Sequence, residues 1–129
     1  MRLLLDTCAL IWWTLDAGKL SSAAAQAIGE DQREDLYISS ISIWEIGIKI
    51  KKGKLDIGTD IADYTARLAK LGRLKILPVD DAVWIKNLEL DWDHRDPADR
   101  TIVATALLHR LAIVTADTSM AAYYPATIW

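Results

Sequence analysis

The chain has 129 residues, of which 52% are hydrophobic and 26% are charged, so it is long enough for one domain with a buried core and too apolar to be disordered. Its formal net charge of −3 excludes the basic surplus that is typical of nucleic-acid-binding domains, so any nucleic-acid site must be local. A single cysteine excludes an internal disulfide and a multi-cysteine zinc site, and two histidines are too few for a histidine-rich metal cluster.

The N-terminal segment has some features of a secretory signal, because Arg2 precedes an apolar stretch and an A-x-A sequence follows at 25–27. However, Asp6 interrupts the apolar stretch, and Asp16 and Lys19 precede the small residues, which breaks the pattern. No apolar run approaches the ~18 residues that a membrane helix needs. We therefore expect a cytoplasmic protein that makes no membrane contact.

The predicted elements alternate between short apolar strands and helices with apolar residues at three- and four-residue spacing. In chain order they are a strand at 2–5, helices at 7–16 and 22–30, a strand at 36–39, helices at 42–53 and 59–72, a strand at 74–79, helices at 81–90 and 97–110, a strand at 111–117 and a possible edge strand at 126–129. Ser21, Asp80 and Asp96 are the expected N-caps. This alternation predicts one α/β domain over residues 1–129, with a mainly parallel central sheet and helices on both faces.

Four carboxylates are placed where such a sheet forms ligand sites, beyond the carboxyl ends of its strands. Asp6 ends the first apolar strand, where a carboxylate is costly to bury without a partner, and Asp117 comes just past the "AIVTA" run. Glu45 and Asp99 are expected in the first turns of their helices. If all four elements open at the same edge, the acids repel one another unless a divalent cation lies between them. Oxygen ligands without His or Cys favour Mg²⁺ or Mn²⁺.

Most of these carboxylates also have a purely structural interpretation. Asp96 as N-cap and Asp99 in the first turn form a helix start that capping chemistry alone explains. Ser42 and Glu45 match the S-x-x-E capping box. Asp117 could be a turn residue after a strand. The combination of the four acids, rather than any single one, favours a site.

Several other residues carry weaker signals. Cys8 is expected to be a small core residue, because no histidine lies in an evident partnering position. Arg95 and Arg100 flank the aspartates and could contact phosphate or pair with acids. A run of lysines contains Lys49, Lys51, Lys52 and Lys54. Its first interpretation is a helix end, because a helix C-terminus favours lysine, and its second interpretation is contact with phosphate.

The tryptophans and Thr115 leave two interpretations open. Five tryptophans indicate core or interface bulk, although an exposed one could stack on a base. They are Trp12, Trp13, Trp44, Trp84 and Trp92. Thr115 lies two residues before Asp117, where it could hold a metal-bound water or merely belong to the strand.

Four segments together resemble the PIN-domain ribonucleases, specifically the VapC-type toxins of bacterial and archaeal toxin–antitoxin pairs. They are "LLLDTCALIWW", "ISSISIWEIGIKIKKGKL", "HRDPADRTIVATAL" and "LAIVTADTSMAAY". "LLLDT" alone is a weak motif, but the four segments occur in the family's order over nearly the whole chain, which makes the resemblance highly specific.

The resemblance implies a metal-dependent ribonuclease whose four acids bind Mg²⁺ or Mn²⁺. These acids correspond to Asp6, Glu45, Asp99 and Asp117. Asp6 and Asp99 would be the principal ligands, and Thr115 matches a Ser/Thr that is frequent near the fourth acid. Close relatives often carry His or Asn where this chain has Cys8, so this position departs from the family pattern.

The implied reaction is the hydrolysis of RNA by a water whose pKa the metal lowers, with attack in line on phosphorus. Glu45 or Asp117 could orient or deprotonate this water. The cation would draw the RNA phosphates, helped locally by Arg95, Arg100 and the lysine run, with Lys49 and Lys52 as its candidates. The resemblance also implies a VapB-type antitoxin whose C-terminal segment reaches the acidic pocket with a basic side chain, a homodimer, and operator DNA bound only through the antitoxin.

Two other functions are less consistent with the residues. A haloacid-dehalogenase-like phosphatase, another Mg²⁺-dependent phosphoryl hydrolase, needs a second Asp two residues after the first, where this chain has Cys8, and a downstream lysine motif that we do not find. A non-catalytic PIN-fold module for protein binding has no need to keep acids at all four positions.

Overall fold

The computed structural model describes residues 2–29 and 36–129, and its centre is a parallel five-stranded sheet in the order β3-β2-β1-β4-β5. The strands are β1 (Leu3–Leu5), β2 (Leu36–Ser39), β3 (Leu74–Leu77), β4 (Ala112–Val114) and β5 (Thr127–Ile128). The predicted parallel sheet is therefore confirmed, and β5 is the edge strand that the sequence indicated.

The helices follow the predicted order, with two additions that the sequence did not predict, a 3-10 helix at 17–19 and a short helix at 118–123. They are α1 (Thr7–Leu15), the 3-10 helix η1 (Ala17–Lys19), α2 (Ser22–Ile28), α3 (Ser40–Lys51), α4 (Ile61–Ala69), α5 (Asp81–Glu89), α6 (Pro97–His109) and α7 (Thr118–Tyr123). Ser21, Asp80 and Asp96 accept backbone N–H groups as N-caps, as predicted. The sequence did not predict the six-residue helix α7. The expected end of the second helix at Glu30 lies outside the described residues.

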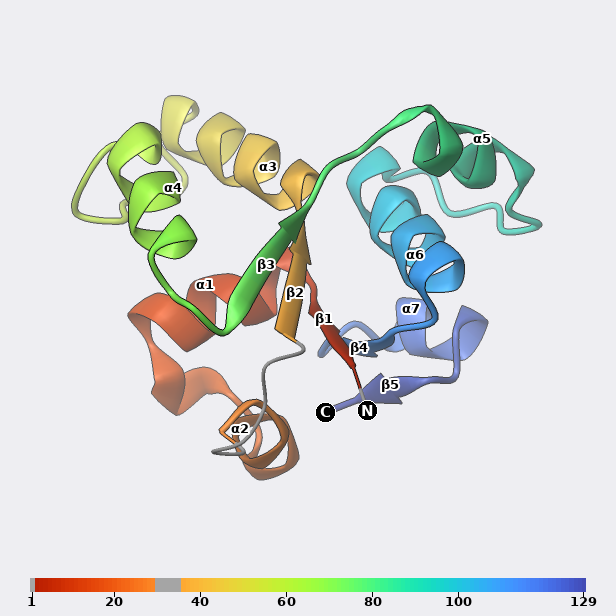
Figure 1. The fold of residues 1–129 in the computed structure, drawn as a ribbon, viewed down its shortest axis with the longest axis horizontal. Helices are drawn as coiled ribbons and strands as arrows, with labels where there is room; N and C mark the ends of the chain where they lie inside the picture. Colours follow the sequence, from red (N-terminus) through yellow and green to blue (C-terminus); the bar gives the residue numbers. More distant parts are fainter. Residues whose placement is uncertain (1, 30–35) are drawn as a thin grey trace.

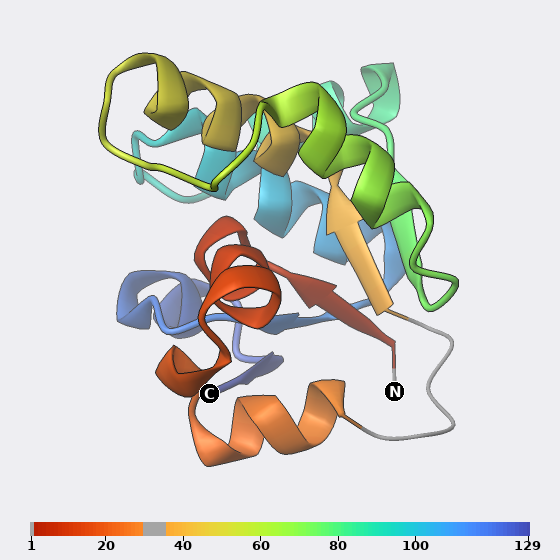
Figure 2. The same ribbon diagram turned by 90° about the vertical axis from the view of Figure 1, so that its left-hand side faces the viewer.

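The helices cover both faces of the sheet, because successive side chains of a strand point to opposite sides. Leu3 and Leu5 of β1 pack with residues of α1, α2 and α4, whereas Leu4 packs with residues of α6 and α7. Figure 1 shows α1, α2 and α4 on one side of the strands and α5, α6 and α7 on the other. In Figure 2, α1, α2 and α4 lie in front of the sheet and α6 lies behind it. None of the described helices is long and apolar enough to span a membrane.

The strand order creates a reversal point between β1 and β4. The chain moves outward from β1 through β2 to β3, and then returns to the other side of β1 to form β4 and β5. The helix after β1 (α1) and the helix after β4 (α7) therefore pack on opposite faces of the sheet. Between them, a crevice opens beyond the carboxyl ends of β1 and β4. Ligand sites of open α/β sheets form in such a crevice. Asp6 directly follows β1, and Asp117 is the third residue after the end of β4.

Candidate metal centre

A cavity of about 410 Å³ lies at this reversal point, and all four predicted acids line it. We call it the acidic cavity. Its lining consists of Asp6, Thr7, Cys8, Trp12, Glu45, Lys49, Asp96, Asp99, Ala116 and Asp117. The fold thus brings together side chains that are separated by more than a hundred positions in the sequence.

Asp6 is the most buried of these acids, with 7% of its surface exposed. It caps α1, because its Oδ1 accepts the backbone N–H of Ala9 at 2.8 Å, and its Oδ2 accepts the hydroxyl of Thr115. Burial raises the pKa of Asp6 to about 6, since desolvation disfavours the charged form more than these two hydrogen bonds favour it. The negative charges of Asp99 and Asp117 act in the same direction.

Asp117 is held at the end of β4 by a hydrogen bond and by a helix cap. Its backbone N–H donates to Oγ1 of Thr115 at 3.0 Å, and its Oδ1 accepts the N–H groups of Ser119 and Met120. Asp117 is therefore the N-cap of α7 rather than a plain turn residue. Thr115 links the ends of β1 and β4 through its hydroxyl.

Asp99 lies in the first turn of α6, and its side chain does not form the cap. Asp96 caps this helix, because its Oδ1 accepts the N–H groups of Ala98 and Asp99. The Oδ2 of Asp99 instead contacts Nε2 of His94 at 2.8 Å. Burial raises the pKa of Asp99, opposed by the bond to His94 and reinforced by the carboxylates around it, Glu45 among them.

The capping-box interpretation of Glu45 is wrong. Helix α3 starts at Ser40 with Ser39 as its N-cap, so Glu45 lies in the second turn rather than the first. Ser42 is buried inside the helix, and its Oγ contacts Oγ1 of Thr7 at 2.9 Å. Among the described residues, Oε1 of Glu45 is a buried side-chain atom without a hydrogen-bond partner. A buried carboxylate oxygen in this state is costly and is suited to bind a cation or a water.

The sequence did not indicate the aromatic stack that holds His94. Its ring stacks on Trp92, with centroids 4.6 Å apart, and Trp92 stacks on Tyr123 at 4.8 Å. Arg100 fixes the same loop, because its guanidinium donates to the backbone carbonyls of Asn87, Leu90, Trp92 and His94. This arrangement favours a structural role for Arg100 over the expected phosphate contact. The only sequence signal was a histidine two residues before a capping aspartate.

Cys8 is exposed and lines the acidic cavity, so the prediction of a core position is wrong. Its neighbours Ala9 and Leu10 form the buried face of α1 instead. Partial burial and the nearby charge of Asp6 raise the pKa of the Cys8 thiol, which makes the reactive thiolate less accessible.

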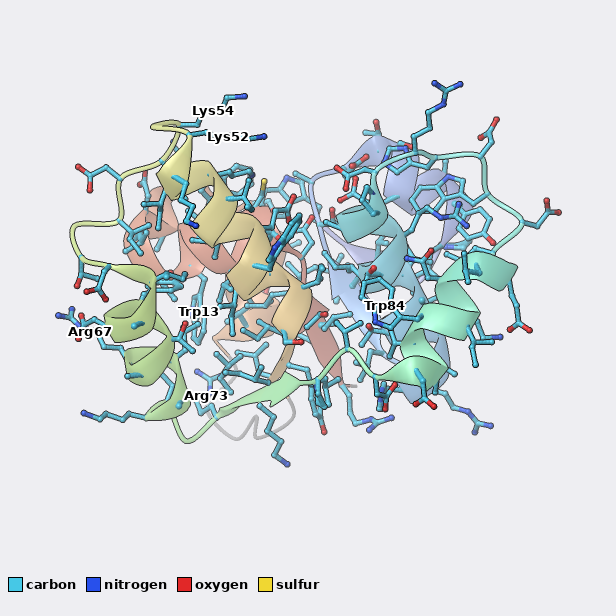
Figure 3. All side chains as sticks on the ribbon, turned by 90° about the horizontal axis from the view of Figure 1, so that it is seen from above. Trp13, Lys52, Lys54, Arg67, Arg73 and Trp84 are labelled. Carbon is cyan, nitrogen blue, oxygen red and sulfur yellow. The ribbon has the colours of Figure 1, made fainter. Side chains whose placement is uncertain are left out.

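The basic side chains and the tryptophans differ in how they lie relative to the site. Lys49 lines the acidic cavity, whereas Arg95 and Lys52 are exposed and are not part of its lining. Figure 3 shows Lys52 projecting outward near the end of α3. None of the six tryptophans is fully buried, but Trp13 and Trp92 pack against the two core clusters, whereas Trp44 and Trp84 are exposed.

The donor set of the cavity fits a hard divalent cation. It offers carboxylate oxygens from five residues, and Mg²⁺ and Mn²⁺ prefer such ligands. Among the described residues, the buried Oε1 of Glu45 has no hydrogen-bond partner, and burial raises the pKa of Asp6, so a cation in the cavity would stabilise both carboxylates in their charged form. As they stand, no three acidic, histidine or cysteine side chains of residues 2–29 and 36–129 are grouped closely enough to hold an ion. Asp6, Asp99 and Asp117 each have hydrogen-bond partners of their own, so the carboxylates line the cavity without forming a ready coordination sphere.

Comparison with known proteins identifies relatives of this architecture. At the sequence level, the chain is 29% identical to Ribonuclease VapC22 of Mycobacterium tuberculosis, over 98% of this chain and 97% of the relative. Among solved structures, it is similar to a chain of a toxin–antitoxin complex from Klebsiella pneumoniae, with 24% identity, a TM-score of 0.67 and coverage of 99% and 97%. FitAcB from Neisseria gonorrhoeae gives 24% identity, a TM-score of 0.67 and coverage of 97% and 93%. These structural matches show a shared fold.

The model of the PIN domain matches residues 3–124. This range begins at β1, includes the elements that carry all four acids, and ends just after α7. Because the match covers nearly the whole fold, the chain belongs to the PIN-domain family, as its four sequence segments indicated.

Proposed function

We propose that this chain is an endoribonuclease toxin of the VapC type that hydrolyses RNA with the help of Mg²⁺ or Mn²⁺. The observation that carries the proposal is the convergence of Asp6, Glu45, Asp99 and Asp117 on one cavity at the reversal point of the sheet. The similarity over nearly the full length to a ribonuclease of the VapC group supports the same activity.

In the proposed reaction, Asp6 and Asp99 are the principal ligands, and Glu45 and Asp117 complete the acidic set. When bound, a divalent cation supplies Lewis acidity, because it polarises the scissile phosphate and lowers the pKa of a water ligand. Asp6 and Asp99 must be deprotonated to act as ligands. Their raised pKa values oppose deprotonation until a cation compensates the charge. The helix N-termini capped by Asp6 and Asp117 also stabilise negative charge at the end of the sheet.

Glu45 is the residue best placed to handle the proton of the attacking water. Its Oε1 is buried and has no hydrogen-bond partner in the described part of the chain, so it can accept a hydrogen bond from a water in the cavity. Thr115 keeps Asp6 and the backbone of Asp117 in fixed relative positions. Lys49, on the same face of α3 one turn after Glu45, lines the cavity where it can contact an RNA phosphate, and Lys52 is a more peripheral candidate.

The proposed partners are an antitoxin of the VapB type, a second copy of the chain, and RNA as substrate. The structural relatives include a toxin–antitoxin complex and the FitAB pair bound to a DNA fragment. Operator DNA would be bound through the antitoxin, because the acidic net charge of this chain gives no footprint for duplex DNA.

The test is RNA cleavage by the purified chain and by Asp6→Asn and Asp99→Asn variants. We expect cleavage that requires Mg²⁺ or Mn²⁺, stops with a chelator, and is lost in both variants while their circular dichroism spectra remain unchanged. Cleavage by Asp6→Asn/Asp99→Asn at the parent rate would contradict the proposed mechanism.

A further inference from the structure

Three aromatic rings form a stack beside the acidic cavity. The ring centroids of His94 and Trp92 are 4.6 Å apart, with an angle of 18° between the ring planes. Those of Trp92 and Tyr123 are 4.8 Å apart, with an angle of 10°. Aromatic pairs at such distances attract one another beyond the effect of the apolar area that they bury. Trp92 is the middle ring, so it holds the other two in place.

The stack connects two segments that lie next to acids of the site. His94 belongs to the loop between α5 and α6, where its Nε2 contacts Oδ2 of Asp99 at 2.8 Å. Tyr123 is the last residue of α7, the helix that Asp117 caps. Trp92 therefore lies between the hydrogen-bond partner of one acid and the helix that follows another.

Different groups hold the backbone of this loop and the ring of His94. The guanidinium of Arg100 donates to the backbone carbonyls of Trp92 and His94, which fixes the path of the chain. These bonds do not restrain the imidazole, whose side chain is 28% exposed and can turn about its own bonds. Stacking on Trp92 keeps the imidazole in the rotamer that reaches Asp99. Loss of the indole should therefore release His94 from Asp99 while the loop backbone stays in place.

Trp92 also has a packing role, which must be separated from its effect on His94. Trp92 and Tyr123 are half-buried and pack against the core cluster that contains Leu4 and Ile113. A leucine could fill much of this space, because packing requires apolar volume rather than a flat ring. Only an aromatic side chain can keep the imidazole parallel to its own face. The two roles therefore respond differently to aliphatic and aromatic substitutions of Trp92.

We propose that Trp92 is a positioning residue of the metal centre, which holds His94 against Asp99 and so aligns this carboxylate for a divalent cation. This inference rests on the proposed function and adds to it a residue that does not itself line the acidic cavity. A carboxylate that accepts a hydrogen bond through one oxygen is oriented before the cation binds, and such a partner raises metal affinity. Trp92 acts on the ion through this partner alone.

The first test is a double-mutant cycle in which calorimetry measures the affinity for Mn²⁺. Trp92→Leu should weaken Mn²⁺ binding about tenfold, because nothing then holds His94 against the carboxylate. Trp92→Phe keeps an aromatic face and should bind Mn²⁺ within a few fold of the parent. In a His94→Ala background, Trp92→Leu should change the affinity by less than about twofold, since the contact that it supports is already lost. Additive effects of the two substitutions would overturn the proposal.

The matched control for lost packing is Leu77→Ala, because Leu77 packs against the same core cluster as Trp92 and does not line the acidic cavity. Urea unfolding gives the loss of stability in each variant, and Leu77→Ala should keep the parent affinity for Mn²⁺ although it is less stable. If Trp92→Leu does not fold, Tyr123→Leu removes the ring behind Trp92 and should weaken Mn²⁺ binding, whereas Tyr123→Phe should not. Equal affinities of the two Tyr123 variants would overturn the proposal.

The second test observes the imidazole of His94 directly by proton–carbon correlation NMR. The chain has two histidines, so the spectrum of His94→Ala identifies the signals of His94. A ring that lies over the face of an indole is shielded by it, so the His94 protons should resonate upfield in the parent and return toward ordinary positions in Trp92→Leu. Unchanged His94 signals would overturn the proposal.

Failure of this inference can be distinguished from failure of the proposed function. If the parent binds Mn²⁺ but the affinities of Trp92→Leu and Trp92→Phe are equal, only the positioning role is wrong. If the parent does not bind Mn²⁺, the proposed metal centre is wrong and the positioning role with it.

Discussion

The hydroxyl of Thr115 joins the two strand ends that carry the first and last acids of the site. It donates to Oδ2 of Asp6 and accepts the backbone N–H of Asp117 at 3.0 Å. All three groups lie at the point where β1 and β4 run side by side, with Leu5 opposite Val114. Thr115 is buried, so no solvent can replace these bonds at low cost.

Replacing Thr115 by valine should therefore destabilise the protein and shift the titration of Asp6. The variant leaves the Asp117 N–H and a buried carboxylate oxygen without a partner, a loss of about 1–3 kcal/mol in the free energy of unfolding. Because the Thr115 bond lowers the pKa of Asp6, its loss raises that pKa further. Thr115→Ser keeps the hydroxyl and serves as the control. Urea unfolding of the two variants at neutral pH measures the difference, and equal stabilities would show that the hydroxyl has no such role.

The metal-free protein should lose stability as the pH rises through the titration of Asp6. The pKa of Asp6 is about 6 in the folded protein, compared with the ordinary aspartate value of 3.8 in the unfolded chain. Between these two pH values, the folded protein therefore binds more protons than the unfolded chain. By linkage, the free energy of unfolding falls across this window, by about 3 kcal/mol at most, and stays lower above pH 6. The raised pKa of Asp99 acts in the same direction.

Asp6→Asn removes this titration and provides the comparison. The variant should be more stable than the parent above pH 6 in the presence of a chelator, and the difference should shrink as the pH falls toward 4. Urea unfolding across this range measures both curves. A constant difference in the free energy of unfolding at every pH would mean that burial does not disfavour the charged form of Asp6.

The contact of His94 with Asp99 should tune metal affinity. A hydrogen-bonded partner orients a ligating carboxylate, and loss of such a partner weakens metal binding about 10–100-fold. His94→Ala removes the 2.8 Å contact and the stack on Trp92, so we expect Mn²⁺ affinity to fall within this range. His94→Gln keeps an N–H donor and should retain more of the affinity. Tighter Mn²⁺ binding by His94→Ala would instead indicate that His94 competes with the ion for Asp99.

The sequence predicted well those elements whose formation depends on local chemistry. The strand at 36–39 and the caps at Ser21 and Asp80 depend on short-range patterns, and the structure has them as predicted. Asp6 and Asp117 met as predicted because their strands are parallel neighbours, a consequence of strand and helix alternation.

Features that depend on tertiary contacts could not be predicted in the same way. Ser39 and Ser42 both offer a helix start, and only the end of β2 decides that Ser39 is the cap, which moves Glu45 into the second turn. The pairing of His94 with Asp99 and the carbonyl contacts of Arg100 arise from the fold of the loop between α5 and α6. A periodic pattern does not describe such a loop, so no direct sequence signal existed for these roles.

The central claim is that Asp6, Glu45, Asp99 and Asp117 bind a divalent cation together. Isothermal titration calorimetry of the purified chain with Mn²⁺ tests it most directly, with Asp6→Asn/Asp99→Asn as the matched variant. We predict saturable Mn²⁺ binding by the parent and none by the double variant, with both proteins folded. Absence of binding to the parent, or equal binding by parent and variant, would contradict the claim.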